Sequence, residues 1–131
     1  KIKISDNIHI LGNVSLVEFN KLLQESSIVM LPLNTDAPAG LIVIFQAASQ
    51  QKTVITTSTP VTKEYIDNKT GVLCENNIDQ FRKEIEYHLQ HPDIAKAKGK
   101  ALYNKLRSEC SNKLYNILLH NENRIGHTCI L

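Results

Sequence analysis

The sequence predicts an α/β protein with a Rossmann-like, doubly wound parallel sheet. Short apolar segments alternate along the chain with longer amphipathic segments that carry helix caps. One short segment, 28–33, is apolar at every position, as is typical of a parallel strand covered by helices on both faces. With 131 residues the chain has the length of one domain, which we place at 1–120, followed by a disordered tail at 121–131.

The N-terminal part predicts a strand followed by a helix. Residues 8–11 form a short β-branched run that ends at a Gly-Asn turn, a pattern typical of a strand. Ser15 and Glu18 have the spacing of a capping box, so a helix is expected to begin after Ser15. Its apolar side chains recur at helical spacing and predict one inward face, made of Leu16, Phe19, Leu22 and Leu23.

The middle of the chain predicts a helix between two strands. The strand 28–33 stops at Pro32, because proline cannot donate to a sheet, and its apolar sequence predicts a central position. Gly40 then opens an apolar helix that runs to about Gln51. Residues 54–57 form the next strand.

The last part of the chain predicts three helices and one strand. A short helix is expected at 62–67 and a strand at 72–74. Asn77 and Gln80 resemble a second capping box, which begins another helix. The inward residues of that helix are Phe81, Ile85 and Leu89. A long basic helix is expected at 93–120.

Composition excludes several classes of protein. Trp is absent and there are only four Tyr and three Phe, so we expect no aromatic platform for single-stranded nucleic acid. The net charge of +2 is too small to indicate a nucleic-acid partner. The three widely spaced cysteines, an odd number, favour free thiols and a reducing compartment; they are Cys74, Cys110 and Cys129. No apolar run reaches the length of a membrane span and no signal peptide is visible, so we expect a cytoplasmic protein.

A set of short motifs follows in a fixed order from Asn7 to Gly71. They are Asn7 to Gly12, Leu31-Pro32 at a strand end, Gly40-Leu41-Ile42 at a helix start, Gln46-Ala47-Ala48 inside that helix, Lys52 to Ile55 as the next strand, and Glu64 followed by Gly71. In this order they resemble the C-terminal, donor-binding half of retaining glycosyltransferases of the GT-B fold (glycosyl transferases group 1, family 4-like), and the resemblance runs to about Leu119. The resemblance implies sugar transfer from a nucleotide-sugar donor in cell-surface polysaccharide or glycolipid assembly. No cofactor and no metal ion is required by the sequence.

The resemblance places the diphosphate of the donor at the start of the helix that Gly40 opens. The first amides of a helix have no partner within it, and the helix dipole favours an anion there. Gly40 also lets the backbone approach a phosphate without a Cβ in the way. We therefore expect Gly40, Leu41 and Ile42 to bind the diphosphate through their N–H groups.

The resemblance implies further donor contacts. Gln46 stands at the position where the family holds the ribose, the loop that ends at Ala39 would face the sugar, and Asn13 with Val14 would lie near the base. Glu64 is included only because it matches the family pattern. No catalytic residue is assigned.

The chain departs from the family pattern in two ways. The family has two glutamates with seven residues between them, where this chain has Pro38 and Gln46. Glutamine can hydrogen-bond a hydroxyl but loses the charge-assisted part, about 1 kcal/mol. The family also has a first strand–helix unit with a basic pair, and an acceptor-binding half, before the segment that Lys1 begins. The resemblance therefore implies a fragment that lacks these parts and is inactive in isolation.

Structural roles explain several of these residues equally well. A buried structural helix would be as apolar as 40–51. A buried Gln46 needs a partner, and a backbone carbonyl serves as well as a ribose. Cys74 follows two apolar strand residues and is expected to pack in the core. His88 and His91 have the spacing for a shared metal, but no third ligand accompanies them, so we expect two solvated histidines.

The basic helix also has two interpretations. Its cations are Lys96, Lys98, Lys100, Lys105, Arg107 and Lys113. They form either a solvated face or a contact with the inner face of an anionic membrane, as a peripheral protein would make.

A different functional class remains open. The chain can be a non-catalytic, transferase-like interaction module that docks a partner chain, which Pro38, Gln46 and the gap left by a missing strand all favour. A receiver domain would need an acidic cluster on its first strands, where only Asp6 lies.

Overall fold

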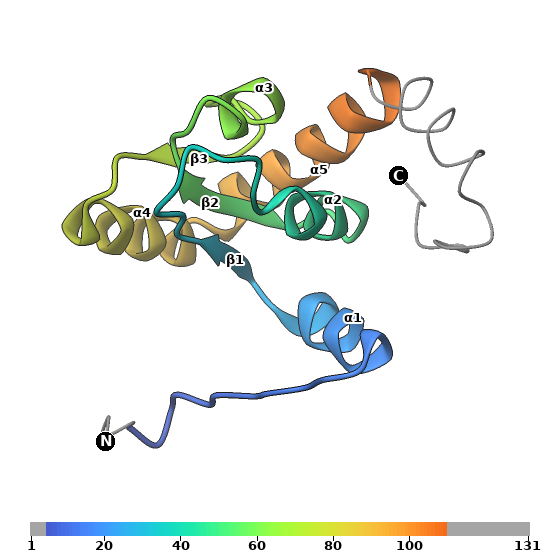
Figure 1. Ribbon diagram of the computed structural model, residues 1–131, viewed down its shortest axis with the longest axis vertical. Helices are drawn as coiled ribbons and strands as arrows, with labels where there is room; N and C mark the ends of the chain where they lie inside the picture. Colours follow the sequence, from blue (N-terminus) through green and yellow to red (C-terminus); the bar gives the residue numbers. More distant parts are fainter. Residues whose placement is uncertain (1–4, 110–131) are drawn as a thin grey trace.

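The computed structural model describes residues 5–109, which form a three-stranded parallel sheet with helices on both faces (Figure 1). In chain order the elements are α1 (Leu16–Glu25), β1 (Ile28–Leu31), α2 (Leu41–Ser49), β2 (Thr53–Thr57), α3 (Thr62–Tyr65), β3 (Val72–Cys74), α4 (Ile78–Gln90) and α5 (Pro92–Glu109). This confirms the predicted Rossmann-like α/β fold. The predicted end of the basic helix and the tail at 121–131 lie outside the described residues.

Strand β2 is the centre of the sheet. The strand order is β1-β2-β3, both pairings are parallel, and all five residues of β2 are buried. Because side chains alternate along a strand, Val54 and Ile55 point to opposite faces. Val54 joins one hydrophobic cluster and Ile55 the other.

Helices α2 and α5 cover the face of the sheet that Val54 reaches. The buried residues of this cluster are Leu23, Ile44, Ala47, Ala48, Val54, Ile66, Leu102 and Leu106. Small side chains at Ala47 and Ala48 allow a close approach between α2 and the sheet. Gly99 does the same for α5, where the helix passes the turn between α2 and β2.

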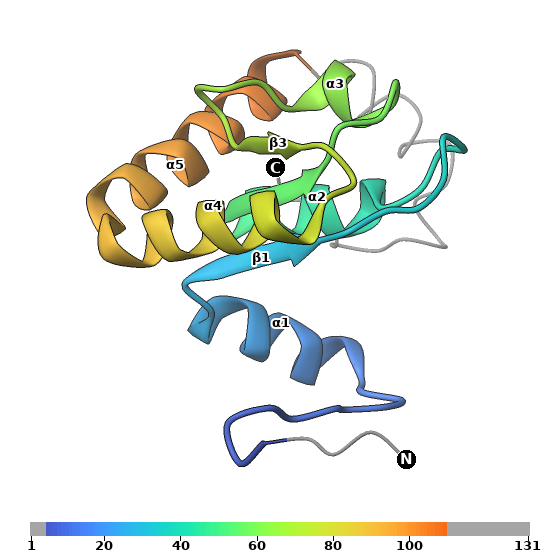
Figure 2. The same cartoon turned by 90° about the vertical axis from the view of Figure 1, so that its left-hand side faces the viewer.

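Helix α4 covers the opposite face (Figure 2). Phe81 is buried and Ile85 half-buried against this face, as predicted. The prediction that Leu89 points inward is wrong, because Leu89 is 55% exposed. His88 takes the inward place instead, since it lies seven residues after Phe81, on the same side of the helix.

His88 is therefore not the solvated residue that the sequence predicted. It is 2% exposed, and its Nδ1–H donates to the Glu84 carbonyl oxygen at 2.7 Å. Nε2 has no hydrogen-bond partner among the described residues. His91 is exposed, as expected.

The helix caps were predicted well, with one difference. Ser15 Oγ accepts from Glu18 N and Glu18 Oε2 accepts from Ser15 N, which completes the first capping box. Asn77 Oδ1 caps α4 by accepting from the first-turn amides. Gln80, however, accepts from Glu75 N at 2.7 Å, so the second capping box is not reciprocal.

Two predictions about the sheet are wrong. Residues 8–11 form no strand, and the apolar side chains of Ile8, Ile10 and Leu11 are exposed, because no described strand lies beside them. Strand β1 lies at an edge of the sheet and not at its centre, and Met30 is 51% exposed. An apolar sequence alone does not distinguish a central strand from an uncovered edge.

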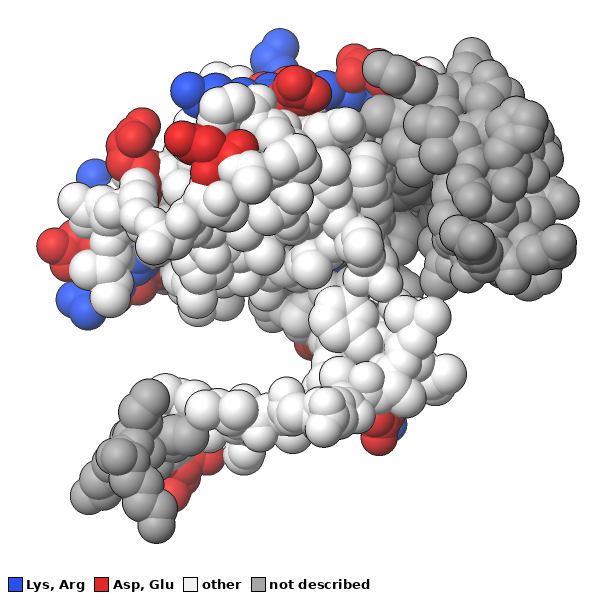
Figure 3. Space-filling model, viewed as in Figure 1, with Lys and Arg blue, Asp and Glu red and all other residues white. Residues whose placement is uncertain are grey.

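Helix α1 extends away from the sheet (Figures 1 and 2). Of its four predicted inward residues, Leu23 is buried and Phe19 half-buried, whereas Leu16 and Leu22 are exposed. In Figure 3 the surface of this segment is mostly uncharged. The amphipathic face therefore exists, but little of the described protein covers it.

We predict that Gly99→Ala destabilises the protein. A Cβ there would overlap the carbonyl oxygen of Gln51 and stand 2.9 Å from the carbonyl carbon of Lys52. Relieving such a clash with backbone typically costs about 1–3 kcal/mol, although Ala is otherwise the better helix former by up to about 1 kcal/mol. Urea unfolding measures the difference. Gly12→Ala is the control, since a Cβ at Gly12 meets nothing within 4 Å, and equal unfolding midpoints for both variants would contradict the packing argument.

Candidate functional site

The candidate site lies where the three parallel strands end. The carboxyl ends of parallel strands meet at one edge of a sheet, and here they deliver the loops 32–40, 58–61 and 75–77. Two contacts tie these loops together. Asn76 Nδ2 donates to Asn34 Oδ1 at 3.4 Å, and Ser58 N donates to the Cys74 carbonyl oxygen at 2.7 Å.

Gly40 is required by the backbone at the start of α2. It is the N-cap with φ 79, a left-handed conformation that side chains with a Cβ rarely adopt. A Cβ would also stand 2.6 Å from Leu31 Cδ2. The structure thus gives Gly40 a conformational reason of its own, beside the close phosphate approach that the sequence predicted.

The amides after Gly40 are available to a ligand. The first bond of the helix runs from Ile44 N to the Gly40 carbonyl oxygen at 3.0 Å, so the amides of the preceding turn have no intrahelical partner. Gly40 has no side chain to cap them, and the first turn contains no acidic residue. Ile42 is 75% exposed, which leaves this end of α2 open to solvent. The arrangement can accept an anion.

The last two threonines of β2 hold the end of β1 and the loop before α2 in place, a role that the sequence did not predict. Thr57 Oγ1 accepts from Leu33 N at 2.8 Å, and Thr56 Oγ1 donates to the Leu31 carbonyl oxygen at 2.8 Å. Both threonines are buried. The available signal was a polar residue inside a buried strand, since such a hydroxyl needs a partner.

Helix α3 follows β2 at the same edge and packs beside α2. The rings of Phe45 and Tyr65 meet edge to face, with their centroids 5.5 Å apart. Glu64, the neighbour of Tyr65, is exposed. The structure therefore brings the helices that carry Gly40 and Glu64 together.

The other residues predicted for the donor site differ in their position relative to Gly40. Gln46 is half-buried on α2, four residues after Ile42 and thus on the same side of the helix. Ala39 is half-buried in the loop before Gly40. Asn13 and Val14 precede α1, in a segment that both ribbon views show apart from α2 (Figures 1 and 2). The described structure does not bring this segment to Gly40.

Cys74 ends β3 and is a packing residue, as predicted. It is fully buried, and burial raises the pKa of its thiol to about 11, with a further contribution from the charge of Glu84. The thiol is therefore neutral at physiological pH and a poor nucleophile. Within residues 5–109 no three His, Cys, Asp or Glu side chains lie close enough to hold a metal ion.

Two lysines of the basic helix, α5, contact neighbouring parts of the protein. Lys98 Nζ donates to the Gly71 carbonyl oxygen at 3.2 Å, and Lys105 Nζ lies 3.2 Å from Asp67 Oδ2. Partial burial raises the pKa of Asp67, but the amide of Lys69 and the ammonium of Lys105 outweigh it, so the pKa is lowered. In Figure 3 cationic and anionic side chains intermingle along the upper side of the protein.

The fold and this edge define an α/β domain of the kind that binds ligands at the carboxyl ends of its strands. Residues 1–106 match the family described as Glycosyl transferases group 1, so the chain belongs to that family. It is a glycosyltransferase domain of the GT-B type, and the family acts on nucleotide-sugar donors and acceptors. Comparison with curated proteins and with solved structures found no match. Among the described helices, none has the length and apolar character to cross a membrane.

We predict that Thr57→Val loosens the loop before α2. The variant keeps the shape of the side chain but leaves Leu33 N without its acceptor, at a cost of about 1–3 kcal/mol. Hydrogen exchange at the Leu33 amide should become faster and the unfolding midpoint should fall. Thr57→Ser, which keeps the hydroxyl, is the control and should leave exchange at Leu33 nearly unchanged. Equal exchange rates in the two variants would show that the hydroxyl does not hold the loop.

Proposed function

We propose that this chain is the donor-binding half of a retaining glycosyltransferase and binds the diphosphate of a nucleotide sugar at the start of α2. The proposed setting is the assembly of cell-surface polysaccharide or glycolipid in the cytoplasm. The observation that carries the proposal is the open amide turn after Gly40, at the carboxyl edge of a domain that belongs to this family.

The proposed role of this edge of the sheet is to stabilise the charge of the leaving diphosphate. As the sugar leaves, negative charge grows on the diphosphate, and fixed N–H donors at a helix start stabilise that charge without reorganising. The amides of Leu41 and Ile42 supply such donors. Gln46 lies one turn further along the same side of α2, which suits a contact to the ribose.

The acceptor would bind to another part of the enzyme. Pro38 and Gln46 stand where the family has acidic residues, so the charge-assisted contacts of those residues are absent from this edge. We propose that the acceptor-binding half and a further strand–helix unit complete the active site. The isolated chain is then expected to bind donor but not to transfer sugar.

We predict that Ile42→Glu weakens nucleotide binding. Ile42 is 75% exposed, so the fold tolerates the change, and an acidic residue suits the first turn of a helix. The carboxylate repels the diphosphate, for which we expect a loss of affinity of about tenfold. The measurement is a titration with UDP and with GDP, followed by backbone amide shifts in NMR spectra.

The matched control is Ile42→Gln, which has the same shape without the charge. In the unchanged chain, shifts should cluster at Gly40, Leu41, Ile42 and Gln46. If Ile42→Glu and Ile42→Gln bound both nucleotides equally well, this edge of the sheet would not contain the phosphate site. Shifts confined to other residues would lead to the same conclusion.

The second candidate function is a non-catalytic interaction module that docks a partner chain. The specific observation is the outer edge of β1, whose backbone has no neighbouring strand among the described residues. Natural edge strands are usually protected by a charge or a proline. The four residues of β1 contain neither, and Met30 is half-exposed.

If this module is the function, the chain should associate through β1. Size-exclusion chromatography over a range of concentrations should then show earlier elution as concentration rises. Met30→Lys should abolish the shift, because a lysine on an edge strand opposes pairing. Ile78→Lys is the control, since Ile78 is equally apolar and 75% exposed but lies on α4. Monomeric elution at every concentration would count against the module as a self-associating strand edge.

A further inference from the structure

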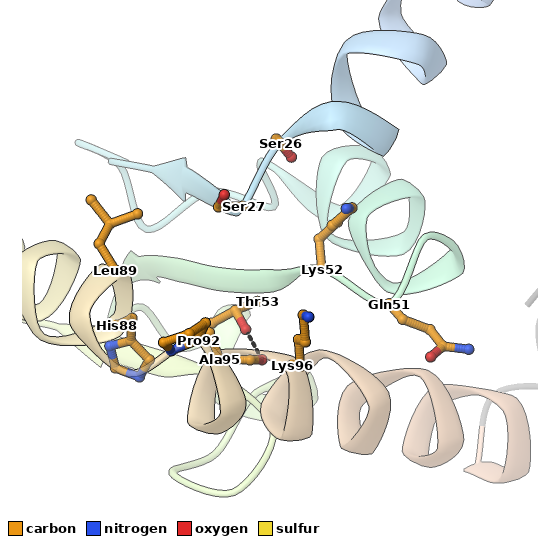
Figure 4. A pocket seen from close by; sticks show the side chains of 10 residues that line it. All are labelled: Ser26, Ser27, Gln51, Lys52, Thr53, His88, Leu89, Pro92, Ala95 and Lys96. Carbon is orange, nitrogen blue, oxygen red and sulfur yellow. Dashed lines mark hydrogen bonds between the residues drawn. The ribbon is translucent and has the colours of Figure 1, made fainter.

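A pocket lies at the edge of the sheet opposite Gly40, where β1 and β2 begin (Figure 4). Its volume is about 190 Å³. Three chain junctions line it: 26–27 between α1 and β1, 51–53 between α2 and β2, and 88–96 from the end of α4 into α5. The pocket shares no residue with the candidate donor site.

The charged side chains that line this pocket are both cationic. They are Lys52 and Lys96, and no lining residue is acidic. Lys52 Nζ donates to the Gln24 carbonyl oxygen at 2.7 Å, which holds it beside the end of α1. An ammonium group has three protons, so two remain for a ligand. In Figure 4 the side chain of Lys96 rises from α5 toward the start of β2.

The hydroxyl groups of the pocket leave one free donor. Ser26 Oγ donates to the Leu23 carbonyl oxygen at 2.7 Å, and Thr53 Oγ1 donates to the Ala95 carbonyl oxygen. Ser27 is exposed, and its hydroxyl has no hydrogen bond within residues 5–109. Two ammonium groups and one hydroxyl thus offer donors to the same space, which suits a ligand with several acceptor oxygens.

We propose that this pocket binds a small anion that carries a phosphate group. Its volume equals that of about six water molecules, which accommodates a phosphate and a few further atoms but not a nucleotide. The bound group would bridge Ser27, Lys52 and Lys96. It would therefore connect the junction after α1 to α5, and it would fix α1, of which Leu23 is the one buried residue, against the sheet.

The test is a titration of the full chain with inorganic phosphate at constant ionic strength, followed by backbone amide shifts. We expect saturable shifts at Ser27, Lys52 and Lys96. Lys96→Gln should lower the affinity by about tenfold, the loss typical of one charge-assisted hydrogen bond. Lys100→Gln is the matched control, because Lys100 is exposed on the same helix but does not line the pocket.

Vesicles distinguish a free phosphate compound from a lipid headgroup as the source of the anion. Sedimentation with phosphatidylglycerol vesicles, lost in Lys96→Gln and kept in Lys100→Gln, would identify a headgroup. Saturation by phosphate without sedimentation would identify a free compound. Three results would overturn the proposal. They are shifts that fail to saturate, the same shifts produced by chloride, and an equal loss of phosphate affinity in the two lysine variants. None of these outcomes depends on nucleotide binding at the other edge.

Discussion

Strand β2 is buried over its whole length, so the hydroxyl group of each of its three threonines needs a hydrogen-bond partner, because a buried hydroxyl without one is costly. Each threonine finds this partner in a different part of the protein. Thr53 donates to the Ala95 carbonyl oxygen of α5, Thr56 donates to the Leu31 carbonyl oxygen of β1, and Thr57 accepts from Leu33 N. The central strand is thereby linked to a covering helix, to the neighbouring strand and to the loop that leads into α2.

The candidate donor site depends on these links. The loop 32–40, which Thr57 holds at Leu33, ends at Gly40, whose left-handed backbone packs on Leu31 and turns the chain into α2. The amides that follow are unpaired because they belong to the first turn of a helix, and Ile42 in that turn is 75% exposed. In the proposed function this helix start, anchored by a buried strand, would supply fixed donors for a leaving diphosphate.

The faces of the sheet and its β1 edge differ in how they are covered. Both faces are covered, by α2 and α5 on one side and α4 on the other, whereas residues 5–109 leave the outer edge of β1 and most of the apolar face of α1 uncovered. Apolar surface and unpaired strand backbone both gain from a partner. The same region borders the cationic pocket, so an anion bound by Lys52 and Lys96 and a partner at β1 would both act on the position of α1.

The fold class, the caps at Ser15 and Asn77, and Gly40 as the start of α2 were predictable from the sequence, because these features follow from local spacing and backbone conformation. They do not show which strand is central, since the apolar sequence of β1 fits a central position at least as well as the three threonines of β2 do, and only the pairing separates the two strands. For the same reason the run 8–11 has the pattern of a strand but joins no strand in the described part of the chain.

The partners of individual side chains were not predictable from local patterns. The rotation of α4 against the sheet buries His88 instead of Leu89, a choice that helical spacing leaves open. The contacts of Thr57 and Lys52 join residues more than twenty positions apart in the chain. Such contacts depend on how the layers are stacked, and no local pattern in the sequence encodes that stacking.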